Sequence, residues 1–318
     1  MNLSIIIPHF NRPDLLEKLL ASIPNNNDIQ IIVVDDKSEL FHLKVLEHLQ
    51  SKYNFELYQN NRIKSAGICR NIGLENAKGK WILFADGDDY FVNGFYSKIN
   101  KYFNSEKDII FFNPISQNID TGKLANRHLP IEKTINEYLN VKSRKSELLL
   151  RYNFIPAWSK MIKKKFMDLH NIKFDQEFGA EDVMLSTKIG YFMKDFEVSK
   201  EVIYCIILRR GSNTRTFNES LFDIRVRARV ARIKFLNQNL SKKEIEVLSS
   251  FIINKASEFL FQSLRQFGFK KFMQVYKLYG QENIKWFSII YLNPFKVIKY
   301  IFNVLYKYLK NTKYNNIN

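Results

Sequence analysis

The sequence is poor in cysteine and has no long uninterrupted apolar segment. Of its 318 residues only Cys69 and Cys205 are cysteines, and they lie far apart and outside any CxxC pattern. A disulfide framework is therefore excluded, and a reduced, cytosolic compartment is expected. No window reaches the roughly 18 apolar residues of a membrane-spanning helix, so we predict that the chain does not cross a membrane. The first residues, MNLSIIIPHFNRPD, lack the basic start and the cleavage site of a signal peptide, so no secretory leader is expected.

Motifs that define several other enzyme classes are also absent. There is no GxGxxG and no GxxxxGK[ST] segment, so dinucleotide oxidoreductases and P-loop kinases lack support. There is no GxSxG motif, and the five histidines show no spacing typical of metal ligands. A nucleotidyltransferase would need a glycine-rich loop after the first expected strand, where this chain has the residues PHFNR.

Positive charge, by contrast, is abundant. The chain has 49 lysines and arginines against 32 acidic residues, which gives a net charge of +17 at pH 7. Such an excess indicates an anionic partner: a nucleic acid, a phosphate-bearing substrate or a lipid surface. Hydrophobic residues make up 46% of the chain, the ordinary share for a globular protein, so a buried core is expected.

The first 110 residues alternate between short apolar runs typical of strands and patterns typical of helices. The expected strands are 3–7, 29–34, 55–58 and 81–85, and the expected helices are 13–23, 40–52 and 66–77. Apolar strands alternating with helices indicate an α/β fold with a mostly parallel, Rossmann-like sheet covered on both faces. Polar residues follow three of the strands, at 8–11, 35–36 and 86–89. Because ligands of such sheets bind beyond the carboxyl ends of the strands, we expect these three clusters to lie together.

The remainder of the chain has a weaker pattern, which becomes helical toward the end. The expected elements are short helices at 132–139 and 146–152, a helix beginning near Glu181, a strand at 202–208, and mostly helix from residue 217. Most of the net positive charge falls in the last third. We therefore predict two parts, an α/β domain at residues 1–216 and a basic, helical C-terminal region at residues 217–318.

The segment Asp86-Gly87-Asp88-Asp89 places three carboxylates within four residues directly after an apolar strand. Carboxylates this close repel one another unless a cation joins them, and oxygen ligands suit Mg²⁺ or Mn²⁺ rather than Zn²⁺. A solvated acidic turn that caps a helix is the alternative. The second acidic turn at the end of another strand, Asp35-Asp36, favours the metal site.

Five segments occur in the order and at the spacing of a known enzyme family. They are SIIIPHFNR (4–12), VVDDKS (33–38), RNIGLENAKGKWILFADGDD (70–89), Trp158-Ser159-Lys160 and GAED (179–182). In these segments the chain resembles the inverting family 2 glycosyltransferases, which have the GT-A nucleotide-diphospho-sugar transferase fold. The resemblance covers roughly residues 3–215 and leaves out the helical C-terminal region.

The resemblance implies roles in donor and metal binding. Asp88 would bind the divalent metal, Mn²⁺ or Mg²⁺, and Asp86 would contact the ribose or the metal. Residues expected around the nucleotide and the donor sugar are Pro8, Phe10, Asn11, Asp35, Arg70, Asp86, Glu181 and Arg210. Helix capping and surface pairing are the alternative for Arg70, and ordinary surface charge is the alternative for Arg210.

The same resemblance makes Asp182 the general base that takes the proton of the acceptor hydroxyl. Asp182 stands at an expected helix start, where the helix dipole favours an ionised carboxylate. Simple capping of that helix is the alternative. Trp158 is expected to stack on a sugar ring of the acceptor, with packing in the core as an equal alternative.

The tail from Ile284 to Asn318 has six lysines and no acidic residue. Its apolar residues and its lysines recur at helical spacing on different faces, with aromatic residues interleaved. A helix of this kind suits the surface of an anionic bilayer. The alternative is a helix packed on the catalytic domain. Nucleic acid is not expected as a partner, because no recognition motif accompanies the charge.

Together with the resemblance, the sequence predicts an inverting, metal-dependent hexosyltransferase. It would move a sugar from a nucleotide donor, expected to be UDP-linked, to a glycan or lipid-linked glycan acceptor in lipopolysaccharide or capsule biosynthesis. We expect it in the cytoplasm, peripheral on the inner leaflet of the membrane. The alternatives are a non-catalytic protein that binds nucleotide or glycan, and a basic membrane-associated adaptor, which would need neither metal nor UDP.

Overall fold

The computed structural model describes residues 1–209 and 218–286. The chain forms two compact units, Met1–Arg232 and Ile233–Asn318. Helix α9 (Glu219–Asn239) runs through the boundary between them. The boundary predicted between residues 216 and 217 falls on residues outside the described ranges, so that division stays a prediction.

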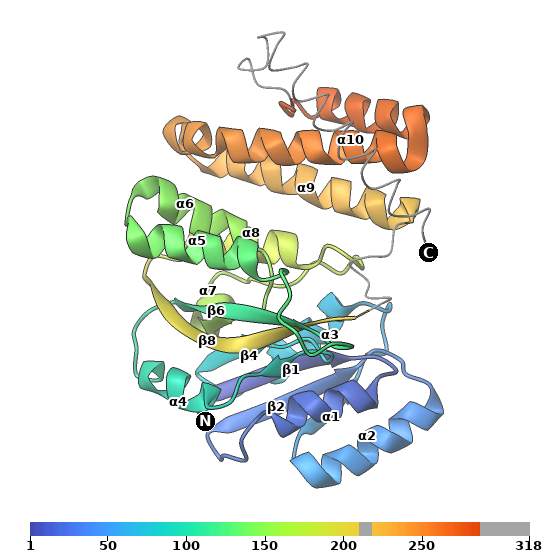
Figure 1. The fold of residues 1–318 in the computed structure, drawn as a ribbon, viewed down its shortest axis with the longest axis vertical. Coiled ribbons are helices and arrows are strands. Elements are labelled where there is room, and N and C mark those ends of the chain that lie inside the picture. Colours follow the sequence, from blue (N-terminus) through green and yellow to red (C-terminus); the bar gives the residue numbers. More distant parts are fainter. Residues whose placement is uncertain (210–217, 287–318) are drawn as a thin grey trace. The chain divides into compact units, whose positions relative to one another are not determined.

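The first unit is built on an eight-stranded mixed sheet with the order β3-β2-β1-β4-β7-β6-β8-β5 (Figure 1). The strands are β1 (Leu3–His9), β2 (Ile29–Asp35), β3 (Glu56–Gln59), β4 (Trp81–Phe84), β5 (Tyr90–Phe91), β6 (Ile109–Asn118), β7 (Lys160–Lys163) and β8 (Phe196–Leu208). Strands β1 to β4 are parallel to one another, and β6 is parallel to β8. Strand β7 is antiparallel to both β4 and β6, and β5 is antiparallel to β8.

Helices cover the sheet on both faces. They are α1 (Pro13–Ala21), α2 (Leu40–Tyr53), α3 (Ala66–Asn76), α4 (Phe95–Ile99), α5 (Leu129–Asn140), α6 (Arg144–Asn153), α7 (Lys164–Leu169) and α8 (Asp182–Phe192). In Figure 1, α1 and α2 lie on one side of the sheet, and α5, α6 and α8 lie on the other. Because both faces are covered, the central strands are mostly apolar: Ile5 and Ile6 of β1 and Ile82 and Leu83 of β4 are fully buried.

Helix α3 packs directly against β1, which brings its polar residues to the end of the sheet. Gly73 makes this approach possible, since a Cβ at that position would collide with the side chain of Ile6. At the start of α3, Ser65 caps the helix by accepting the backbone N–H of Gly67 at 3.2 Å. The backbone N–H of Ser65 also donates to Asp36 Oδ1 at 3.2 Å, which holds the start of α3 beside the end of β2.

The predicted α/β fold with a helical C-terminal region is confirmed, but three strands, β5, β6 and β7, were not predicted. Apart from two short helices, residues 111–180 were expected to be irregular, yet they contain most of β6 and all of β7. Pro114 interrupts the apolar run of β6, and the structure accommodates it where the register with β8 is irregular. Strand β7 has four residues and begins with a buried lysine, so its sequence carries almost no strand signal.

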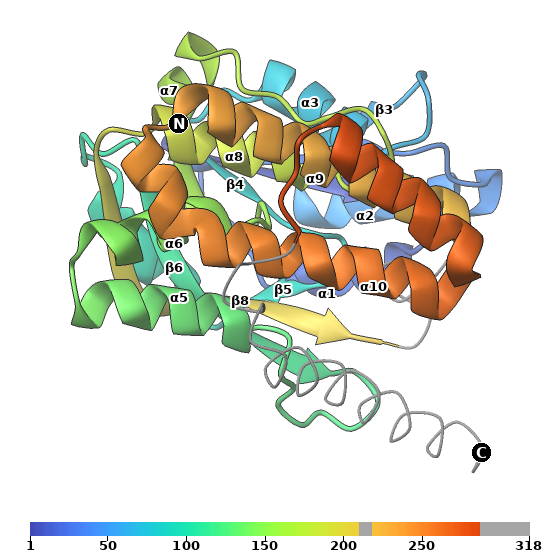
Figure 2. The ribbon, with the colours of Figure 1, turned by 90° about the horizontal axis from the view of Figure 1, so that it is seen from above.

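The second unit contains the long helix α10 (Lys242–Gln281), which begins with Ser241 and Glu244 capping each other. Gly268 has φ of 82° and breaks the helix into two arms that fold back along each other (Figure 2). Phe261 and Phe272 pack between the arms with ring centroids 6.4 Å apart. Within the described ranges no helix has both the length and the apolar composition needed to cross a membrane. Residues 287–318, most of the predicted membrane-surface tail, lie outside those ranges.

Candidate functional site

The polar residues that follow β1 and β2 are joined by hydrogen bonds. Parallel pairing places His9 opposite Asp35, and His9 Nδ1 lies 3.0 Å from Asp35 Oδ1. Asp35 also accepts the hydroxyl of Ser38 at 2.5 Å and its backbone N–H at 2.9 Å. Burial acts to raise the pKa of Asp35, but these hydrogen bonds outweigh it and hold that pKa below its ordinary value. Asp35 is therefore a buried, ionised anchor for the loop after β2.

The loop after β1 presents its predicted donor-binding residues next to this anchor. The backbone N–H of Asn11 donates to Ser38 Oγ at 2.8 Å, and Asn11 Oδ1 accepts the N–H of Glu39. Phe10 is 41% exposed, and the ammonium of Lys64 lies 2.8 Å from the centre of its ring. Pro8 is half-buried, and its carbonyl oxygen lies close to Gly87. The loops after β1, β2 and β4 thus meet, as the sequence predicted.

Within the acidic loop after β4, the three carboxylates have different environments. The side chains of Asp86 and Asp88 are 32% and 29% exposed. Asp89 is buried and accepts the backbone N–H of Ile207 at 2.7 Å, which attaches the loop to β8. Burial, together with the neighbouring charges of Asp86 and Asp88, raises the pKa of Asp89 well above its ordinary value. Only Asp86 and Asp88 are accessible to a ligand.

Arg70 on α3 connects this loop with the start of α8. Its Nη2 donates to Asp86 Oδ1 at 2.6 Å, and its Nη1 lies 3.7 Å from Asp182 Oδ1. The residue is 7% exposed, and its guanidinium lies 5.2 Å from the centre of the Phe174 ring. Burial disfavours the cation, but the surrounding carboxylates more than offset this effect and raise the pKa of Arg70. Arg70 is therefore a fixed positive charge between two acids that lie far apart in the sequence.

Asp182 is the first residue of α8, and Glu181 occupies the N-cap position before it. The side chain of Asp182 is 28% exposed, and its buried Oδ1 has no hydrogen-bond partner among the described residues. Burial raises the pKa of Asp182 to about 6, against the opposing effect of Arg70. Such a carboxylate is ionised at neutral pH, yet basic enough to accept a proton. Glu181 is nearly buried, and its side chain lies against Gly67 at the start of α3.

Two of the remaining predicted residues lie outside this group. Trp158 is 5% exposed, and its ring stacks on Tyr204 with centroids 5.7 Å apart. This position corresponds to the core-packing alternative, so a contact with an acceptor stays a prediction. Arg210 lies outside the described residues. Its neighbour Arg209 is described, and its Nε donates to Asp88 Oδ2 at 3.0 Å.

Sequence reasoning did not assign roles to three residues that hold the site in place. They are His9 and Ser38, which bind Asp35, and Tyr204, whose hydroxyl accepts the backbone N–H of Asp86 at 2.8 Å. The position of His9 opposite Asp35 follows from strand register and was within reach of the sequence. Tyr204 comes from β8, 118 residues from Asp86 in the chain, and no local pattern indicates its partner.

The oxygen atoms of Asp86 and Asp88 are suitable ligands for Mg²⁺ or Mn²⁺. Among residues 1–209 and 218–286, no three histidine, cysteine or acidic side chains come together as a ready-made metal site. Divalent ions of this kind are commonly held by one or two carboxylates together with phosphate oxygens of the substrate, so two protein ligands suffice. Each carboxylate currently pairs with an arginine, Arg70 or Arg209.

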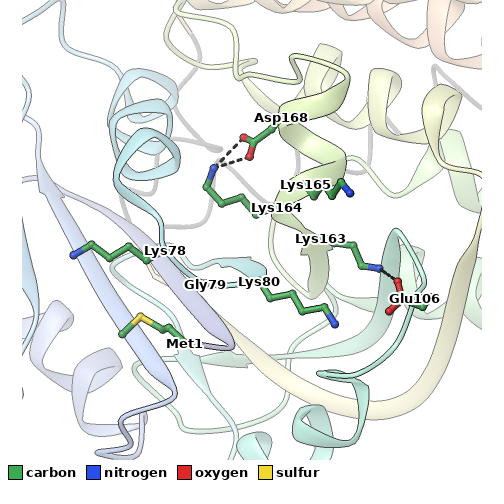
Figure 3. A pocket seen from close by; sticks show the side chains of 9 residues that line it. All are labelled: Met1, Lys78, Gly79, Lys80, Glu106, Lys163, Lys164, Lys165 and Asp168. Atoms are coloured by element: carbon green, nitrogen blue, oxygen red, sulfur yellow. Dashed lines mark hydrogen bonds and ion pairs between the residues drawn. The ribbon is translucent and has the colours of Figure 1, made fainter.

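A separate pocket of about 460 Å³ lies at the opposite edge of the sheet, where β1 and β4 begin (Figure 3). Its lining consists of Met1, Lys78, Gly79, Lys80, Glu106, Lys163, Lys164, Lys165 and Asp168. Part of its positive charge is neutralised locally, because Lys163 pairs with Glu106 and Lys164 with Asp168. None of the predicted site residues lines this pocket.

Comparison with known proteins decides the family. The family model for glycosyl transferase family 2 matches residues 4–169, just over half of the chain. This chain belongs to glycosyl transferase family 2. It is thus a glycosyltransferase, and the predicted resemblance and GT-A fold are both confirmed. The matched range contains the loops after β1, β2 and β4 and ends before Asp182.

Similar proteins include two bacterial glycosyltransferases. A GalNAc(5)-diNAcBac-PP-undecaprenol beta-1,3-glucosyltransferase of Campylobacter jejuni is 29% identical over 219 residues, which make up 67% of this chain and 67% of that protein. Glycosyltransferase GlyA of Streptococcus pneumoniae is 26% identical over 74% of this chain. The match covers only 34% of GlyA, so this chain corresponds to about a third of that protein.

Among solved structures, residues 1–349 of TarS from Staphylococcus aureus in complex with UDP-GlcNAc have the same fold. The TM-score is 0.62 with 19% sequence identity, and the match covers 88% of this chain and 92% of the other. At this level of identity the likeness concerns the fold, and it covers more of the chain than the family-model match.

Proposed function

We propose that this glycosyltransferase catalyses inverting, metal-dependent transfer of a sugar from a UDP-linked donor to a glycan acceptor. The observation that carries the proposal is the pairing of Arg70 with both Asp86 and Asp182. It joins the acidic loop after β4 to the start of α8, so the carboxylates suited to metal binding and to proton transfer share one centre. Asp182 Oδ1 and Arg70 Nε are buried without hydrogen-bond partners among the described residues, so each keeps a hydrogen-bonding capacity that the ion pairs do not use.

On the donor side, Asp88 and Asp86 would hold Mn²⁺ or Mg²⁺. When bound, the ion would stabilise the negative charge that develops on the diphosphate leaving group. Asp35, Asn11 and the exposed ring of Phe10 lie around the end of the neighbouring strands and would contact the nucleoside. Arg209, which pairs with Asp88, would be free to face the diphosphate when Asp88 takes the ion.

On the acceptor side, Asp182 would accept the proton of the attacking hydroxyl while the oxygen attacks the sugar carbon. Because the base and the leaving group act on opposite faces of that carbon, the transfer inverts its configuration. A pKa of about 6 keeps Asp182 ionised at pH 7 and near the pH at which general bases work best.

The related proteins support the nature of the substrates. TarS was solved with UDP-GlcNAc, and the Campylobacter jejuni enzyme is named for an acceptor linked through a diphosphate to undecaprenol. By analogy we propose a UDP-sugar as donor and a glycan, or a lipid-linked glycan, as acceptor in the synthesis of a surface polysaccharide. The surface polysaccharides that we propose are lipopolysaccharide and capsule.

A lipid-linked acceptor would place the enzyme at the cytoplasmic face of the membrane. We propose that the basic tail, residues 284–318, binds that surface. The test is flotation with anionic vesicles, in which deletion of the tail should abolish binding. Undiminished binding by the shortened protein would contradict this part of the proposal.

The catalytic proposal is tested by separating UDP binding from turnover. Asp182→Asn should abolish transfer while UDP still raises the melting temperature in the presence of Mn²⁺. Asp88→Ala should lose the Mn²⁺-dependent part of that stabilisation. Asp168→Asn, an exposed aspartate on α7 that pairs with Lys164, is the matched control and should behave as wild type. Near-normal turnover of Asp182→Asn would refute its role as base, and a protein insensitive to both UDP and Mn²⁺ would favour the adaptor alternative.

A further inference from the structure

A buried lysine that the mechanism above does not use is hydrogen-bonded to α8, the helix that begins with Asp182. Lys160, the first residue of β7, is 1% exposed. Its Nζ donates to the carbonyl oxygen of Phe154 at 2.5 Å and to Ser186 Oγ at 3.1 Å, and it lies 4.6 Å from the centre of the Phe154 ring. Within residues 1–209 and 218–286, no carboxylate lies close enough to form an ion pair with it. A buried cation without a paired anion is costly, so an uncharged side chain would serve packing alone better.

The hydrogen bonds of Lys160 attach it to the helix that carries Asp182. Ser186 lies four residues after Asp182 on α8, so the two side chains are on the same face of the helix, one turn apart. The hydroxyl of Ser186 accepts from Lys160 and donates to the carbonyl oxygen of Ile155. These bonds connect the first two turns of α8 to the segment that leads into β7.

Charges from four places act on Asp182. Arg70 of α3 and Lys160 of β7 favour its ionised form, whereas Asp86 of the loop after β4 and Glu181 at the N-cap of α8 disfavour it. Arg70 is already bound to Asp86 at 2.6 Å, so its charge is shared. Lys160 differs because, among the described residues, its hydrogen bonds go to neutral groups, and Asp182 is the charged group that acts on it. Burial lowers the pKa of Lys160 to about 7, so it is mostly cationic near pH 6, where Asp182 titrates.

We propose that Lys160 is a positioning residue for Asp182: its hydrogen bonds fix the start of α8, and its charge favours the ionised carboxylate. The inference rests on the proposed function, in which Asp182 accepts the proton of the acceptor hydroxyl. Lys160 keeps its own proton during transfer and touches neither donor nor acceptor. Lys160 raises the fraction of enzyme molecules in which Asp182 is ionised, and so able to accept a proton, at a given pH.

The test compares the pH dependence of kcat/KM in wild type and Lys160→Met. A nearby opposite charge typically lowers a carboxyl pKa by about one unit or more, so its removal should shift the acid limb by about one unit toward higher pH. With a shift of one pKa unit, kcat/KM of Lys160→Met should be about five- to tenfold below that of wild type at pH 6 and should match it above pH 8. UDP affinity should be unchanged, because Lys160 bonds to Phe154 and Ser186 and not to Asp86 or Asp88. Should Lys160→Met fail to fold, Lys160→Gln removes the charge and keeps a hydrogen-bond donor.

Two further variants separate charge from mechanical support. Lys163→Met, in the same strand but paired with Glu106, should leave the acid limb in place. Ser186→Ala removes a hydrogen bond while the charge stays, so it should reduce turnover equally at all pH values. An unshifted acid limb in both Lys160 variants, or an equal loss at every pH, would overturn the inference. If the Lys160 inference is overturned but Asp182→Asn is inactive in the same assay, the proposed function still stands. If Asp182→Asn retains activity, the proposed function itself fails.

Discussion

Replacing Arg70 by methionine tests the central ion pair, because methionine keeps the apolar part of the side chain and removes its charge. The change would leave Asp86 and Asp182 without their shared cation. Removing one partner of a fully buried ion pair costs about 3–5 kcal/mol, but both carboxylates here are about 30% exposed and partly screened by solvent. We therefore expect a loss of about 1–3 kcal/mol. In a unit of this size that loss lowers the melting temperature by about 3–10 °C.

The same variant has a second, independent readout. Arg70 opposes the rise in the pKa of Asp182, so its removal should move that pKa further above 6 and shift the acid limb of kcat/KM to higher pH. Mn²⁺ with UDP should restore part of the lost stability, because the ion brings positive charge back to Asp86. Thermal unfolding with and without Mn²⁺ and UDP measures both effects. A melting temperature within about 1 °C of wild type, with an unshifted acid limb, would refute the reasoning.

Two other variants follow from the same structure. Asp182 has a folded-state pKa of about 6, above its ordinary value of 3.8, so its contribution to stability is present at low pH and is lost as pH rises from about 4 to 6. Asp182→Asn should therefore unfold at a higher temperature than wild type at pH 7.5, although it is inactive. The reasoning would be contradicted if its melting temperature at pH 7.5 were equal to or below that of wild type and the difference between the two proteins were the same at pH 4. Gly73→Ala should destabilise the catalytic unit by about 1–3 kcal/mol, because its Cβ collides with the buried side chain of Ile6. Gly280→Ala, where a Cβ meets nothing within 4 Å, is the matched control and should not be destabilised, as thermal unfolding would show.

The meeting of the loops after β1, β2 and β4 could largely be predicted from sequence. Each of these loops directly follows an apolar strand, and parallel strands end at the same edge of a sheet, so the residues after β1, β2 and β4 had to lie together. The contacts of Asn11 with Ser38 and of Gly87 with the Pro8 carbonyl bear out that inference. The order of strands and loops along the chain was enough to predict this meeting, because it depends on the pairing of neighbouring parallel strands and on no other long-range contact.

The region between β4 and α8 could not be predicted in the same way. Strand β7 is four residues long and antiparallel, and it starts with Lys160, so neither its length nor its pattern marks a strand. Its position depends on pairing with β4 and β6, partners that lie about 80 and 50 residues earlier in the chain. Short strands of this kind form because neighbours offer free backbone groups, which is a property of the assembled sheet.

By itself, then, the sequence determined the alternation of strands and helices and the acidic loop at the end of β4, since apolar periodicity and local composition act over a few residues. Only the tertiary structure decided which charges meet. It placed Arg70 between Asp86 and Asp182, turned Asp89 inward to β8, and buried Lys160 under α8. The physical reason is that burial and charge pairing set the state of an ionisable group, and both depend on residues distant in the chain.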